Sequence, residues 1–128
     1  MSRLLLDTHV LLWANAAPDR LGPSSTERLL DPSVELLVSA VSVAEIAIKR
    51  SIGRLSMSLP TASLMEPLAA VELALTNEHA AALERLPLLH RDPFDRLLAA
   101  QAMSDGVTLL TADRRLLAYP VEVMDALT

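Results

Sequence analysis

Four short apolar segments constrain the fold of this chain more than any other feature of its sequence. They occupy residues 3–8 (RLLLDT), 34–39 (VELLVS), 71–76 (VELALT) and 107–111 (VTLLT), and residues 121–124 form a weaker fifth candidate. Their apolar residues run together instead of strictly alternating with polar ones, which is typical of strands buried on both faces of a parallel sheet. We therefore expect a central, mostly parallel sheet of four or five strands.

Helical signals fill the intervals between these segments. Helix starts are indicated at Ser24 and Ser42, each followed by Glu three residues later, at Asn77, and at Asp92, which precedes Pro93. Gly106 ends the last of these helices. Because strands that alternate with helices form βαβ units, the sequence predicts an α/β fold, a three-layer sandwich. Residues 51–67 are the least regular part, where we expect a helical hairpin or a loop.

The length of 128 residues suits one domain, residues 1–128, and no repeat or linker divides it. Hydrophobic residues make up 52% and charged residues 21%, which excludes a disordered chain. Cysteine is absent, which excludes a disulfide scaffold, a thiol nucleophile and a Cys-ligated zinc site. The first residues are typical of neither a signal peptide nor a membrane span, so we expect a cytoplasmic protein.

Leucine and alanine are abundant for so small a chain. A small domain has limited interior volume, so part of this apolar surface is expected to face another chain. We expect a homodimer, or a partner helix lying in a groove. A Leu-rich core with no such partner is the other explanation.

Four acidic residues are placed by the predicted elements at one edge of the sheet. Asp7 directly follows the first apolar run, and Asp113 comes shortly after the fourth. Glu45 lies one turn into the helix after the second strand, and Asp95 holds the equivalent place in the helix after residue 92. Open α/β sheets bind ligands outside the carboxyl ends of their strands, so we expect these four carboxylates to converge there.

Carboxylates that crowd together repel one another, and some take up protons unless a cation lies among them. Oxygen ligands favour Mg²⁺ or Mn²⁺, whereas Zn²⁺ prefers His and Cys. One or two such ions can activate a water molecule and stabilise the leaving oxygen of an in-line displacement. The sequence thus predicts phosphodiester hydrolysis by metal-activated water, with Asp7, Glu45, Asp95 and Asp113 as catalytic and metal-ligating residues.

The charge balance bears on the substrate. The formal net charge of −5 disfavours nucleic acid, yet a cation site inverts the local charge, and ten Arg stand against the single Lys49. Since only 2% of residues are aromatic, a nucleic acid would be held by its backbone. Candidate backbone contacts are Arg91, Arg96, Arg114 and Arg115. Thr8 and Thr111 flank the acids and can orient a water or a phosphate, and His9 and His90 can approach the pocket.

Each acid also has a possible structural role. Glu45 completes a capping box with Ser42, and Asp92 before Pro93 is a good N-cap. Asp95 lies in the first turn of a helix, where the helix dipole favours an acid, and Asp113 can cap a short helix at residues 114–118. Asp7 has the weakest structural explanation, because nothing after three leucines requires a charge. Trp13, Phe94 and Tyr119 are expected in the core or an interface.

Taken together, four blocks of sequence resemble the PIN-domain ribonucleases, specifically the VapC-type toxins of type II toxin-antitoxin systems. The blocks are LLLDTHVLLW, VSAVSVAEIAIK, HRDPFDRLLAAQA and LLTADRRL, and they span nearly the whole chain. The resemblance implies a PIN-like three-layer fold, an RNA substrate and Mg²⁺ or Mn²⁺ at the same four acids. It implies products with a 5′-phosphate and a 3′-hydroxyl, and it adds Asp92 and Thr111 as auxiliary residues. It also implies a cognate antitoxin that presses a peptide into the acidic groove, often with an Arg in place of the cation.

A different class of function stays open. The chain can be a non-catalytic α/β module that binds a partner through its Leu-rich surface, with the acids acting as helix caps. A phosphoryl-accepting receiver domain is disfavoured, because it needs a Lys after a late strand and Lys49 lies in a predicted helix.

Overall fold

The computed structural model describes residues 2–89 and 91–128, and in these residues five parallel strands form one sheet. The strands are β1 (Ser2–Leu6), β2 (Val34–Ser39), β3 (Val71–Leu73), β4 (Thr108–Thr111) and β5 (Val123–Asp125). Their order is β3-β2-β1-β4-β5, so β1 lies at the centre. The expected α/β sandwich with a parallel sheet is confirmed, and the weaker fifth strand is present.

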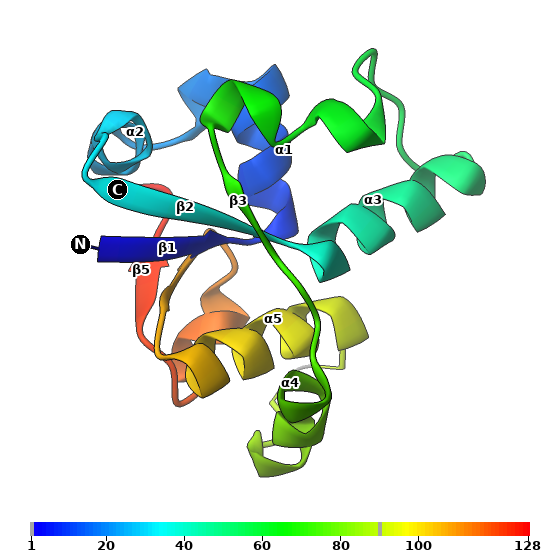
Figure 1. Cartoon of the computed structure of the whole chain (residues 1–128), viewed down its shortest axis with the longest axis vertical. Helices are drawn as coiled ribbons and strands as arrows, with labels where there is room; N and C mark the ends of the chain where they lie inside the picture. Colours follow the sequence, from blue (N-terminus) through cyan, green and yellow to red (C-terminus); the bar gives the residue numbers. More distant parts are fainter. Residues whose placement is uncertain (1, 90) are drawn as a thin grey trace.

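Helices cover both faces of this sheet (Figure 1). They are α1 (Thr8–Ala16), α2 (Pro23–Leu30), α3 (Ala40–Ser51), α4 (Asn77–Ala82) and α5 (Pro93–Asp105). Helices α1 and α2 lie on one face and α4 and α5 on the other, while α3 runs outward from the end of β2. Single 3₁₀ turns occupy Pro18–Arg20, Thr61–Ser63, Glu66–Leu68, Leu83–Arg85 and Arg114–Ala118.

The alternating side chains of β1 divide the core into two halves. Leu5 packs with α5 and α4 on one face, in a cluster that includes Leu98 and Tyr119. Leu4 and Leu6 pack with α1 on the other face. All three leucines are completely buried, which explains the uninterrupted apolar run that marked this segment as a central strand. Trp13 and Phe94, expected in the core or an interface, are partly buried against the two clusters.

Two strands end earlier than the sequence predicts. Strand β1 stops at Leu6 because Asp7 is the N-cap of α1, a helix that the sequence analysis did not assign. Strand β3 stops at Leu73, pairs only with Leu37–Ser39 and lies at the edge of the sheet. Thr76, expected at its end, instead caps α4 in a reciprocal capping box with His79.

The two Ser-x-x-Glu capping boxes were wrong. Helix α2 begins at Pro23 after Gly22, because proline is pre-organised for the first helical position. Helix α3 begins at Ala40, capped by Ser39, whose side chain accepts a hydrogen bond from the Val41 amide. The buried strand β2 therefore turns directly into helix, and Ser42 and Glu45 lie inside α3.

The predicted boundaries of α5 are confirmed. Asp92 is its N-cap, Pro93 is its first residue, and Gly106 ends it in the left-handed conformation. Of the two alternatives for residues 51–67, the loop is found and not the helical hairpin, and it contains the 3₁₀ turn Thr61–Ser63 and the start of the next, Glu66–Leu68. The Arg50 guanidinium anchors this loop by donating to the carbonyl oxygens of Met57 and Leu59. Within the described residues, no helix has the length and hydrophobicity needed to cross a bilayer.

Gly22, which precedes α2, packs closely against the backbone of residues 127–128, and a substitution tests this packing. A Cβ at Gly22 would lie 2.2 Å from the carbonyl carbon of Thr128 and 2.4 Å from the carbonyl oxygen of Leu127. Its φ of −69° suits any residue, so the expected loss in Gly22→Ala is purely steric, about 1–3 kcal/mol of unfolding free energy. Urea denaturation measures it. Gly106→Ala is the control for backbone strain without a clash, at about 1–2 kcal/mol; a Gly22→Ala protein as stable as wild type contradicts the packing.

Candidate active site

Asp7 lies at the carboxyl end of the central strand. Its amide donates to the Leu110 carbonyl oxygen at 3.0 Å and so extends the pairing of β1 with β4 by one residue. One carboxylate oxygen accepts from the Val10 amide at 2.8 Å, and the other accepts from the Thr111 hydroxyl. The side chain is only 2% exposed. Asp7 therefore has a capping role that the sequence analysis missed, and its carboxylate is fixed in orientation.

Burial raises the pKa of Asp7 from 3.8 to about 6. The hydrogen bonds from Thr111 and Val10 oppose this shift, as does the nearby charge of His9, whereas the negative charge of Asp95 adds to it. Asp7 and Asp95 are thus close enough to repel each other, although they are 88 residues apart in the sequence. A cation between them would relieve both the burial penalty and the repulsion.

Helix α5 brings two acids to the same edge. Asp92 caps the helix by accepting from the Phe94 amide at 2.9 Å and from the Asp95 amide at 3.3 Å. Asp95 is half-buried in the first helical turn. The charges of both acids reach Arg115, whose pKa is raised mainly by its hydrogen bond and charge interaction with Asp113. The structural role expected for Asp92 is confirmed, and the charge of Asp95 acts on both Asp7 and Arg115.

Asp113 joins the site through Thr111. The Thr111 hydroxyl oxygen accepts a hydrogen bond from the Asp113 amide at 3.0 Å, and the same hydroxyl donates a hydrogen bond to the Asp7 carboxylate. The Asp113 carboxylate caps the 3₁₀ helix at Arg114–Ala118 and accepts two bonds from the Arg115 guanidinium, at 3.1 and 3.0 Å. The predicted capping role of Asp113 is therefore confirmed. Thr111 is the side chain that links Asp7 to the segment carrying Asp113.

Glu45 reaches the site from α3 and is 3% exposed. One of its oxygens accepts from the Thr8 hydroxyl at 2.7 Å, and the other accepts from the Lys49 ammonium at 2.6 Å. The Ser42 hydroxyl oxygen lies 3.1 Å from that of Thr8, and the Glu45 carboxylate accepts from side chains and not from the Ser42 amide as a capping box requires. Lys49 was not a predicted site residue. The signal that could have found it is the Glu-to-Lys spacing of four residues in a helix.

A buried amide fixes the helices that carry these acids. Gln101 of α5 is completely buried and accepts a hydrogen bond from the Ser39 hydroxyl at 2.5 Å. Its own amide group donates to the Ala74 carbonyl oxygen at 3.3 Å. Since Ser39 caps α3, this contact holds the helix of Asp95 against the start of the helix of Glu45.

Strands β1 and β2 end on the right of the sheet in Figure 1, and α1, α3 and α5 begin on that side. In the described residues, no group of three His, Asp or Glu side chains is close enough to enclose a metal ion. Mg²⁺ usually keeps several waters and needs only one or two protein carboxylates, so oxygen ligands from Asp7 and Asp95 fit it.

The four candidate arginines differ in their surroundings. Arg96 was expected at the rim, but its guanidinium donates to the Pro87 carbonyl oxygen at 3.0 Å, the Tyr119 hydroxyl at 3.3 Å and the Leu83 carbonyl oxygen at 3.4 Å. These contacts give Arg96 a structural role. Arg115 pairs with Asp113, whereas Arg91 and Arg114 are exposed, with no hydrogen bond or ion pair to the described residues.

Of the two candidate histidines, His9 lies next to the site in the chain. His9 is exposed and its ring centroid lies 6.1 Å from that of Trp13. Its charge acts on Asp7, so it approaches the site as expected. His90 lies outside the described residues.

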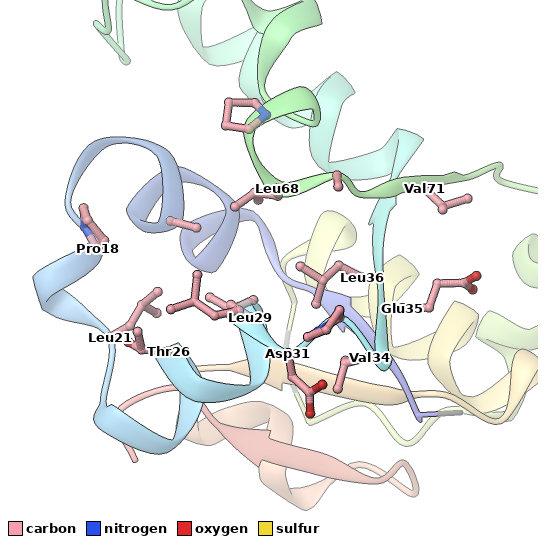
Figure 2. A pocket seen from close by; sticks show the side chains of 15 residues that line it. Pro18, Leu21, Thr26, Leu29, Asp31, Val34, Glu35, Leu36, Leu68 and Val71 are labelled. Carbon is pink, nitrogen blue, oxygen red and sulfur yellow. The ribbon is translucent and has the colours of Figure 1, made fainter.

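A separate apolar hollow lies away from the acids. It has a volume of about 620 Å³ and opens between α1, α2, the amino half of β2 and the segment before β3 (Figure 2). The side chains labelled around it include Leu21, Leu29, Leu36 and Leu68, with Asp31 and Glu35 nearby. Because it adjoins the start of β2 and not its end, this hollow is not the site of the four acids.

Comparison with known proteins settles the family. A model of the PIN domain matches residues 4–122. The chain belongs to the PIN-domain family. This PIN domain is 35% identical over 119 residues to Ribonuclease VapC22 of Mycobacterium tuberculosis (strain ATCC 25618 / H37Rv), with 91% of each chain covered.

Solved structures share the fold of this PIN domain. One is VapBC2 from Rickettsia felis bound to a promoter DNA fragment, with a TM-score of 0.72, 16% identity, and 96% of this chain and 98% of that chain covered. Another is FitAcB from Neisseria gonorrhoeae, with a TM-score of 0.65, 23% identity, and 96% and 97% covered.

The protonation of Asp7 predicts how stability depends on pH. The folded state holds a proton up to about pH 6, whereas an ordinary Asp loses it near 3.8, so this group makes the protein less stable as pH rises between those values. Asp7→Asn keeps the cap and removes the charge. In EDTA at pH 7.5 we expect the variant to be more stable by about 2–3 kcal/mol, with the gain vanishing near pH 4.

Thermal and urea melts from pH 4 to 8 measure this difference. Asp95→Asn serves as the comparison, because relief of repulsion leaves stability equal or higher, whereas loss of a helix-dipole contact costs about 0.3–1 kcal/mol. An Asp7→Asn protein that is destabilised equally at all pH values would show that the carboxylate is a favourable structural charge.

Proposed function

We propose that this PIN domain is an Mg²⁺- or Mn²⁺-dependent endoribonuclease, a toxin that hydrolyses RNA and is neutralised by a cognate antitoxin. The observation that carries the proposal is the buried Asp7 carboxylate, fixed by Thr111 and within the field of Asp95. A buried, oriented carboxylate beside another acid suits a divalent cation. The 35% identity to a protein named Ribonuclease VapC22 supports RNA as the substrate class.

The side chains divide the work by their contacts. Asp7 and Asp95 are the residues proposed to hold the ion, and Glu45 and Asp113, which in the described part of the chain form no group of three with them close enough to enclose an ion, are proposed to act through the waters that it keeps. Bound Mg²⁺ or Mn²⁺ supplies an acidic water and stabilises negative charge on a phosphoryl oxygen. Thr111 keeps the Asp7 oxygen in one orientation, and Asp92 fixes the first turn of α5 so that Asp95 stays at the rim. Hydrolysis across the P–O3′ bond leaves a 5′-phosphate and a 3′-hydroxyl.

The RNA backbone is proposed to follow the exposed arginines. Arg91 and Arg114 flank Asp92 and Asp113, and both present their charge to solvent. Arg115 also lies at this rim, although its guanidinium already pairs with Asp113. Arginine suits phosphate because its planar group donates two parallel hydrogen bonds.

The partners proposed for this chain are an antitoxin and a second copy of itself, in the cytoplasm. Large apolar side chains are exposed at several places, among them Leu30 at 77%, Ile52 at 61% and Leu88 at 75%. A partner chain that covers such side chains would remove their apolar surface from water. The structures of similar fold are named as VapBC and FitAB assemblies, which supports an antitoxin partner.

A non-catalytic partner-binding module is the second candidate. It is favoured by the finding that Asp7, Asp92 and Asp113 all cap helices. Capping alone does not explain why Asp7 and Thr111 are buried together or why Asp95 lies near them. Activity measurements separate the two candidates.

Cleavage of total RNA tests the proposed reaction. With Mg²⁺ or Mn²⁺ we expect cleavage that EDTA abolishes, and Asp7→Asn and Asp95→Asn are each expected to lower the rate on the order of 10²–10³-fold, the effect of losing one preorganised electrostatic group. Glu35→Gln, on the amino half of β2, is the matched control and should cleave like wild type. Wild-type protein that cuts no RNA with either ion would favour the binding module.

Salt dependence tests the arginines. Binding of single-stranded RNA to the Asp7→Asn protein is measured from 50 to 200 mM salt, conditions in which each phosphate contact contributes roughly 0.7 to the slope of log K against log[salt]. Arg91→Ala and Arg114→Ala should each reduce the slope by about that amount. Arg96→Ala should lower stability and leave the slope unchanged. An unchanged slope in both exposed variants would place the RNA elsewhere.

A further inference from the structure

Lys49, the single lysine of the chain, forms an ion pair with Glu45, a buried acid proposed for the site. Lys49 Nζ lies 2.6 Å from Glu45 Oε2, and the Lys49 side chain is 41% exposed against 4% for that of Glu45. Exposed helix pairs of this spacing contribute little, because water screens both charges. Here the carboxylate is buried, so the interaction is screened far less.

The other oxygen of Glu45 also has a partner. Glu45 Oε1 accepts from the Thr8 hydroxyl, and Thr8 follows Asp7 directly in the chain. Both oxygens of Glu45 are therefore occupied, one by a cation and one by the neighbour of Asp7. Among the described residues, no other cationic side chain forms an ion pair with Glu45.

We propose that Lys49 is a built-in counter-cation of Glu45, which competes with the divalent ion for this carboxylate and thereby sets the affinity of the proposed site for metal. The inference rests on the proposed metal-dependent function. Like charges at short range in a partly buried site repel strongly, so an ammonium on Glu45 opposes a second cation beside it. Lys49 is thus a positioning residue, which stabilises the acids before metal binds and limits how readily it binds.

Titration with Mn²⁺ alone, on EDTA-treated and dialysed protein, tests this by calorimetry. Lys49→Met keeps the aliphatic stem and removes the charge, so we expect the Kd for Mn²⁺ to fall by roughly three- to tenfold. Lys49→Arg keeps the charge and should stay within about twofold of wild type. In the Glu45→Gln background, Lys49→Met should no longer change the Kd, because the two residues act through one interaction.

Thermal melts give a second readout that a merely structural salt bridge does not produce. Lys49→Met should melt below wild type in EDTA, and the difference should shrink in saturating Mn²⁺. Equal losses of melting temperature in EDTA and in Mn²⁺, with an unchanged Kd, would overturn the proposal, as would weaker Mn²⁺ binding.

RNA plays no part in these measurements, so the outcome is separable from that of the proposed function. The expected change in Kd in a protein that cuts no RNA would support the counter-cation and reject the nuclease. Absence of Mn²⁺ binding to wild type and to all variants would reject both the counter-cation and the metal dependence.

Discussion

The burial of the Asp7 carboxyl group at the end of the central strand is the constraint on which the rest of the site depends. A carboxylate removed from water is costly unless hydrogen bonds or a cation compensate it. Thr111 and Val10 supply the hydrogen bonds, yet the pKa of Asp7 still rises to about 6, so compensation is incomplete. A protein that needed only a helix cap at this position could use a neutral Asn or Ser. A carboxyl group at this position is what the proposed cation site would use.

Capping and chemistry are not competing explanations for these acids. The amino end of a helix favours negative charge, and a parallel sheet places the amino ends of the following helices at the carboxyl ends of its strands. An acid that caps such a helix is therefore already at the ligand-binding edge. Asp7 and Asp113 each cap a helical segment at this edge, and Asp92 caps the helix that carries Asp95. The backbone hydrogen bonds that stabilise each helix also orient the carboxylates.

Much of the fold could be predicted because its signals are local. The apolar run before Asp7, the Asp-Pro start of α5 and its Gly106 end each depend on a few neighbouring residues, and all three are confirmed. Helix α1 was missed because Thr8 and Val10 are poor helix formers, and burial of one face of this helix against the sheet outweighs that preference. The Ser42–Glu45 capping box failed for a related reason, since the tight turn from β2 moves the start of α3 back to Ala40.

The sequence by itself determined the α/β class and the places of the strands along the chain, because both follow from hydrophobic periodicity, whereas the convergence of the four acids on one ion stays a prediction. Only the tertiary structure decided what each side chain touches. In the folded chain the Asp7 carboxylate accepts a hydrogen bond from Thr111, and Lys49 pairs with Glu45. The Arg96 guanidinium, expected at the rim of the site, donates to carbonyl oxygens of the protein. Such contacts depend on packing between segments far apart in the chain, and no local pattern specifies which polar groups meet when those segments are buried together.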